Sequence, residues 1–178
     1  MSWREAPHRR RLLAAALLLP LALGGCNIHP LYGAAAPGDV TTQDKLAGIV
    51  IDQVPDRFGH YLVQELGFAL DGSGTDSAKA RYRLSIKTTE SVNSSIVNTI
   101  TGNATAAYVS GSANYTLTRI GTDEVVYSGS ASAIASYTRN EQRFASVRAA
   151  RDAEIRVAEQ LAEQIRNRLA AKLSTTKG

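Results

Sequence analysis

Cysteine, aromatic side chains and unbalanced charge are all scarce in this sequence. Cys26 is the one cysteine in 178 residues, so the chain cannot form an internal disulfide. Aromatic residues make up only 6% of the chain. The formal net charge is +4, but four basic residues and one acidic residue precede Cys26, so the rest is close to neutral. Without a large basic excess to meet phosphates, we expect no nucleic-acid partner.

The residue patterns that carry catalysis are also missing. G-x-S-x-G, the Walker A loop and H-E-x-x-H do not occur. After Cys26 the histidines are His29 and His60, and the pattern around His60 indicates a solvated helix position. The carboxylates are scattered, except for Asp123 and Glu124 beside a turn. We therefore expect a protein that is not an enzyme and has no metal site or cofactor. An envelope hydrolase whose serine or aspartate site lacks a local signature is the alternative.

Residues 1–25 have the order of a lipoprotein signal peptide. Basic residues come first, ending in Arg9 to Arg11, and an apolar run from Leu12 to Ala22 follows. Leu23-Gly24-Gly25-Cys26 then matches a lipobox, Leu-x-Gly-Cys, in which the thiol is alkylated before cleavage. We predict that Cys26 becomes the acylated first residue. Each buried methylene contributes about 0.8 kcal/mol, so several acyl chains anchor a protein stably.

Other interpretations of this start are an ordinary signal peptide with a coincidental cysteine, a short transmembrane helix and a twin-arginine signal. The apolar run is shorter than the roughly 20 residues that a spanning helix needs. Asn27, rather than aspartate, follows the cysteine, and by resemblance to bacterial lipoproteins this favours outer-membrane sorting. The run from Ala34 to Gly38 is typical of a short tether.

The next segment predicts a strand followed by a helix. Gly48 to Val54 is rich in β-branched residues and stops at Pro55. Asp56 stands at the N-cap position of a 3.6-residue apolar pattern, which ends in stop signals at 71–74. The apolar face of that helix consists of Phe58, Leu62, Leu66, Ala69 and Leu70.

From residue 79 onward the apolar period is two, which indicates strands. Tyr82, Leu84 and Ile86 alternate with polar residues, and turns are expected at 101–103 and 121–123. Two long strands with small residues on one face and serines on the other flank the second turn. Phe144 to Leu173 then predicts a long helix with an apolar stripe that extends back to Val147. Arg151 and Glu154 also lie on this stripe and are spaced to pair with each other.

This order predicts an α+β fold, a two-layer sandwich of β-α-β-β-β-α order. Two helices pack on one face of a mainly antiparallel four-stranded sheet. The expected division is a signal peptide at 1–25, a lipidated N-terminus and tether at 26–45, one domain at 46–173 and a disordered tail at 174–178.

A basic stripe is the one candidate binding site of this domain. Arg81, Arg83 and Lys87 lie on the outer face of one strand, and Arg119 lies near the end of the next. Such groups on a rigid sheet suit the phosphates of an amphipathic lipid. They also protect exposed strands from aggregation, and the residues alone favour that protective role.

Four short motifs, at 25–33, 57–66, 113–117 and 136–137, resemble those of the LptE family of lipopolysaccharide-assembly lipoproteins. Gly25 to Gly33, GCNIHPLYG, is similar to the family start Cys-Gly-Phe-x-Pro-Leu-Tyr. Arg57 to Leu66, RFGHYLVQEL, is similar to Arg-x-Gly-Gln-x-Leu-x-x-x-Leu, and the resemblance continues in Ala113 to Leu117 and at Ser136-Tyr137. Ile28-His29 and His60 depart from the family pattern, and Ala106-Ala107 stand where a basic lipid-contacting residue is expected.

The resemblance implies a protein without catalytic activity that plugs and helps assemble the LptD β-barrel of the outer membrane. It implies delivery of lipopolysaccharide to the outer leaflet, with lipopolysaccharide itself as a second partner. It also raises the case for Arg83 and Lys87 as lipid contacts. An auxiliary lipoprotein of an ABC-type lipid transporter remains the alternative function.

Overall fold

The computed structural model of the chain describes residues 41–71, 80–97, 104–139 and 142–175. The predicted signal peptide, Cys26, the tether up to residue 40, the turn at 101–103 and the last three residues lie outside them. The elements are α2 (Thr42–Ala47), β1 (Ile49–Ile51), α3 (Arg57–Asp71), β2 (Tyr82–Val97), β3 (Ala104–Arg119), β4 (Val125–Thr138) and α4 (Arg143–Thr175). The α+β fold and the β-α-β-β-β-α order are confirmed, and α2 is an addition that was not predicted.

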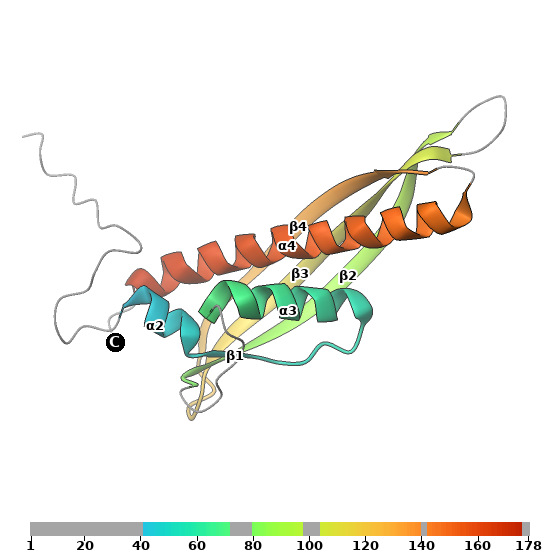
Figure 1. Cartoon of the computed structure of the whole chain (residues 1–178). Helices are drawn as coiled ribbons and strands as arrows, with labels where there is room; N and C mark the ends of the chain where they lie inside the picture. The colour runs from blue at the N-terminus through green and yellow to red at the C-terminus, as the bar shows by residue number, and fades with distance from the viewer. Residues whose placement is uncertain (1–40, 72–79, 98–103, 140–141, 176–178) are drawn as a thin grey trace, which may run out of the picture. The chain divides into compact units, whose positions relative to one another are not determined.

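The sheet has the strand order β1-β2-β3-β4. β1 pairs in parallel with the first three residues of β2, and the other two pairs are antiparallel. α3 and α4 lie side by side on one face of the sheet (Figure 1), and no other described helix or strand packs on the opposite face. This is the predicted two-layer sandwich.

Local sequence explains where α3 begins and how the β3–β4 hairpin turns. The Asp56 carboxylate accepts a 2.7 Å hydrogen bond from the backbone N–H of Gly59, which satisfies one free donor of the first turn of α3. Gly121 has φ 96° and Asp123 has φ 53°, a conformation that suits glycine and is tolerated by aspartate. The N-cap at Asp56 and the turn at 121–123 are therefore confirmed.

The core lies between the helices and the sheet, and glycines set how closely they approach. A Cβ on Gly111 of β3 would lie 2.5 Å from Phe58 Cζ and 2.7 Å from Val157 Cγ1, so α3 and α4 pack directly on this strand. A Cβ on Gly129 of β4 would lie 2.6 Å from the hydroxyl oxygen of Tyr115. The small residues of β3 and β4 thus make room for side chains of the domain itself.

α4 also covers the free edge of β4. Arg156 Nη2 donates to the Ser136 carbonyl at 2.9 Å, Gln164 Nε2 donates to the Ser132 carbonyl at 3.1 Å, and Arg168 donates to the Ser130 carbonyl. Four helix residues rise about 6 Å and two strand residues about 6.6 Å, so donors four apart match carbonyls two apart. These side chains occupy backbone acceptors that an added strand would need.

Two details of α4 differ from the sequence-based expectation. Glu154 does not pair with Arg151, and instead accepts hydrogen bonds from Arg57 of α3. The helix includes Ser174 and Thr175, the first two residues of the expected tail. Among the described residues no helix is long and apolar enough to cross a membrane.

Candidate functional site: the open face of the sheet

The face of the sheet opposite the helices is built mainly from small polar side chains. Alternation along each strand directs every second residue away from the core. The register aligns these residues in rows across β2, β3 and β4, such as Lys87–Asn114–Ser130, Thr89–Ser112–Ser132 and Ser91–Ser110–Ile134. We call this surface the open face.

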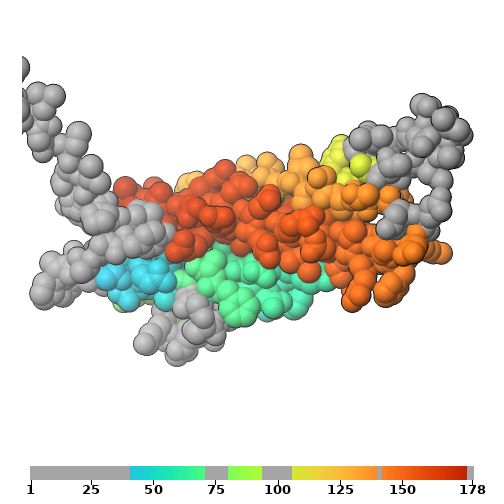
Figure 2. Space-filling view, turned by 45° about the horizontal axis from the view of Figure 1, so that its top comes forward, coloured from blue at the N-terminus to red at the C-terminus, as the bar shows by residue number. Residues whose placement is uncertain are grey.

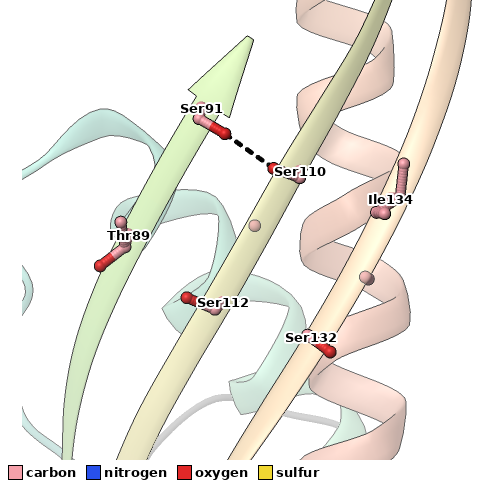
Figure 3. A pocket seen from close by; sticks show the side chains of 8 residues that line it. Thr89, Ser91, Ser110, Ser112, Ser132 and Ile134 are labelled. Atoms are coloured by element: carbon pink, nitrogen blue, oxygen red, sulfur yellow. Dashed lines mark hydrogen bonds between the residues drawn. The ribbon is translucent and has the colours of Figure 1, made fainter. Parts of the chain in front are cut away.

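Two shallow depressions cross the open face. One, of about 550 Å³, is bordered by Thr89, Ser91, Ser110, Ser112, Ser132 and Ile134, which come from all three strands (Figure 3). The hydroxyls of Ser91 and Ser110 are 2.7 Å apart and hydrogen-bonded within it. The second, of about 500 Å³, extends the surface toward Lys87 and Asn114.

This arrangement can form many hydrogen bonds. Its hydroxyls and amides both donate and accept, so they match a polar surface laid flat against them. Its one charged member along the three rows is Lys87, which is exposed. Within the described residues no group of three or more His, Cys, Asp or Glu side chains could hold a metal ion. His60 is an exposed residue of α3, as the sequence indicated.

The structure brings together only part of the predicted basic stripe. Arg83 and Lys87 share the outer side of β2, and the exposed Arg81 directly precedes that strand. Arg119 belongs to the opposite side of the sheet, because it follows Leu117 by two residues and its guanidinium lies 5.9 Å from the ring centroid of buried Tyr82. Arg119 is therefore separated from the other three by the sheet.

Arg83 is engaged by a carboxylate that the sequence reasoning missed. Asp52, just after β1, has Oδ1 3.3 Å from Arg83 Nη1, and its Oδ2 accepts a 2.5 Å hydrogen bond from the Ser85 hydroxyl. Asp52 lies beside Arg83 because β1 pairs in parallel with β2, and no local sequence pattern predicts that pairing. Lys87 has no ion pair with any other described residue. It is therefore the better placed of the two for an external anion.

A charged cluster lies on the helix side, at the start of α3. Arg57 Nη2 is 2.7 Å from Glu154 Oε1, and Glu154 is buried while the Arg57 side chain is half exposed. Burial, and then the neighbouring Glu154 carboxylate, raise the pKa of Glu90 on β2 above its usual value. The hydrogen bond with Glu154 raises the pKa of Arg57, which stays charged. The cluster therefore joins α3, α4 and β2.

Comparison with known proteins identifies the family to which the chain belongs. The model of the LptE family, described as lipopolysaccharide-assembly, matches residues 46–169. The chain belongs to the LptE family. It is thus a lipopolysaccharide-assembly lipoprotein, and the resemblance seen in the sequence motifs is confirmed. No curated protein matches the chain.

The fold of this LptE-family chain is shared by a solved structure. A Caulobacter crescentus CB15 protein described as a lipoprotein is 20% identical, with a TM-score of 0.64 over 76% of this chain and 97% of that one. The minor lipoprotein of Acinetobacter baumannii is 13% identical, with a TM-score of 0.49 over 69% of this chain and 88% of that one. Rare lipoprotein B of Shewanella oneidensis is 11% identical, with a TM-score of 0.45 over 72% of this chain and 92% of that one.

Proposed function

We propose that this LptE-family chain is a non-catalytic, lipid-anchored protein of the outer membrane that plugs an LptD-type β-barrel. In that role it helps the barrel to assemble and assists delivery of lipopolysaccharide to the outer leaflet. The observation that carries the proposal is the open face, three long strands rich in hydroxyl and amide side chains that no other described element covers.

The chemistry of the open face matches the inside of a membrane barrel. The lumen of such a barrel is polar, while its apolar band faces the lipid. Serine and threonine hydroxyls can bond to either donors or acceptors of a lumen wall. They are also short, so a wall can approach the serine and threonine rows of the strands closely.

Membrane attachment and lipid contact complete the proposal. Acylation of Cys26 would hold the domain at the outer membrane near its barrel partner. Lys87, and next to it Arg83, would meet phosphates of lipopolysaccharide at the edge of the open face. Arg81 belongs to the same side of β2. Arg119 lies on the opposite side of the sheet, so it would contact a lipid phosphate only there.

Affinity purification from detergent-solubilised envelopes tests the plug role. The chain should capture an outer-membrane β-barrel, identified by mass spectrometry, in near-equal amounts. Capture of the subunits of an ABC-type lipid transporter without a barrel would support the rival function and contradict the plug role.

A further inference from the structure

α4 is longer than the helix that packs beside it. α3 begins at Arg57, which meets Glu154 of α4. The preceding residues of α4, 143–153, continue past the start of α3, and Figures 1 and 2 show this overhang at the N-terminal end of α4. Eleven residues at 1.5 Å each span about 16 Å. Along this stretch no other helix of the described residues lies beside α4.

The apolar seam on which α3 packs continues along this overhang. Glu154, Ala158, Leu161 and Ile165 are buried members of the seam, at spacings of four and three. The same spacing continues backward through Arg151 and Val147 to Phe144. Phe144 is 74% exposed and Val147 is 56% exposed, so the apolar side chains of the seam continue here but face solvent.

A core-facing residue of β2 is exposed near this end of the sheet as well. Val92 of β2 has the same orientation as the core residues Leu84 and Ile86, yet it is 54% exposed. It lies further along β2 than Glu90, the residue that approaches the start of α3 through Arg57. We call Val92, Phe144, Val147, Arg148 and Arg151 the overhang surface.

Arginines border this apolar surface. Arg143, Arg148 and Arg151 are exposed, and no ion pair joins them to another described residue. The Arg148 guanidinium lies 5.4 Å from the Phe144 ring centroid. The nearby Glu154 carboxylate is already held by Arg57. Exposed aromatic and arginine side chains of this kind are the residues enriched at the energetic centres of protein interfaces.

We propose that the overhang surface is the docking site for an amphipathic helix of the barrel partner that carries apolar and acidic side chains. This proposal rests on the proposed function and deepens it by naming a contact surface. A helix is the occupant because the seam has the three- and four-residue spacing on which α3 already packs. Carboxylates on that helix match the three arginines, and its apolar side chains cover Val92, Phe144 and Val147.

Variants of the lipidated full-length chain test this docking surface by the yield of captured barrel. The double variant Phe144→Asp/Val147→Asp and the single variant Arg151→Glu should each lower that yield about tenfold, which corresponds to about 1.4 kcal/mol. Phe68→Asp is the matched control, because Phe68 is 56% exposed but lies on α3, outside both the overhang surface and the open face. Thermal unfolding of each variant by circular dichroism should match the unsubstituted chain, since the replaced side chains are exposed.

Each outcome has a defined meaning. Loss of capture in the overhang variants, with capture retained by Phe68→Asp, supports the docking surface. Undiminished capture by the overhang variants overturns the docking surface and leaves the plug role intact. An equal loss of capture in the control variant overturns the docking surface in the same way. Loss of binding to phosphatidylglycerol vesicles with capture of the barrel unchanged also overturns it, because the surface would then meet lipid. If the unsubstituted chain captures no barrel, the proposed function and this surface are both overturned.

Discussion

Arg57 at the start of α3 holds Glu154 of α4 through two hydrogen bonds, 2.7 Å from Nη2 to Oε1 and 3.1 Å from Nε to Oε2. The two residues are 97 positions apart in the sequence. Because Glu154 is buried and Arg57 is half exposed, the ion pair stabilises the contact of the two helices mainly by satisfying a carboxylate that water cannot reach.

Removal of the arginine alone should therefore destabilise the domain more than replacement of the carboxylate. Arg57→Ala leaves a buried carboxylate without its cation, and we expect a loss of about 1–3 kcal/mol in the free energy of unfolding, less than for a fully buried pair. Glu154→Gln keeps hydrogen-bonding atoms and should cost less. Urea unfolding of both variants checks this, and an equal effect would contradict the assigned role.

Glu90 should make stability depend on pH. Its pKa is raised in the folded state by burial and by Glu154, so the folded state binds this proton more tightly than the unfolded state. The resulting stabilisation is fully present below the unfolded-state pKa and is lost as pH rises through the folded-state pKa.

Glu90→Gln tests that dependence. The variant should gain stability relative to the unsubstituted chain as pH rises toward 7, and the gain should disappear below about pH 4. Urea midpoints measured across this range give the comparison. A variant that is less stable at pH 7 would show that Glu90 contributes favourably as a carboxylate.

Gly111 should tolerate no side chain while Phe58 is present. Gly111→Ala brings a Cβ within 2.5 Å of Phe58 Cζ and 2.7 Å of Val157 Cγ1, and overpacking of this kind costs about 1–3 kcal/mol. Phe58→Leu relieves the first of these contacts. The double variant should therefore lose less free energy of unfolding than the sum of the losses in the two single variants. Gly67→Ala is the matched control, because nothing lies within 4 Å of its added Cβ.

Lys87 should contribute to lipopolysaccharide binding if the open face meets that lipid. Lys87→Glu should weaken binding of purified lipopolysaccharide by about tenfold, since it replaces an attractive charge with a repulsive one. Arg83→Gln should have a smaller effect, because Arg83 is shared with Asp52. Arg119→Gln, on the other side of the sheet, is the control and should bind normally. Unchanged binding in both Lys87→Glu and Arg83→Gln would remove these residues from the proposal.

Local patterns were sufficient to predict most of the fold. The period-two alternation from Tyr82 to Ile86 and the N-cap at Asp56 both describe neighbours along the chain, and both are confirmed. The capping box formed by Thr41 and Asp44 begins α2, and it was visible in the sequence. Because α2 has only six residues, its apolar pattern is too short to predict a helix.

Contacts between distant segments could not be read in the same way. Arg151 is the near neighbour of Glu154 in sequence, but helix packing brings Arg57 closer. Asp52 reaches Arg83 only because β1 pairs in parallel with β2. The position of Arg119 was available from the sequence, because it shares the parity of the core residues Tyr115 and Leu117.

The most direct test of the plug role is whether the open face becomes inaccessible inside the barrel. Ser130→Cys places a single thiol on an exposed position of that face, and Cys26 is the one native cysteine. If Cys26 is alkylated as predicted, the unsubstituted chain gives no background labelling by a water-soluble maleimide. The account predicts that Ser130→Cys is labelled in the isolated chain and protected in the purified barrel complex, with labelling restored after denaturation. Equal labelling of the isolated chain and of the complex would contradict it.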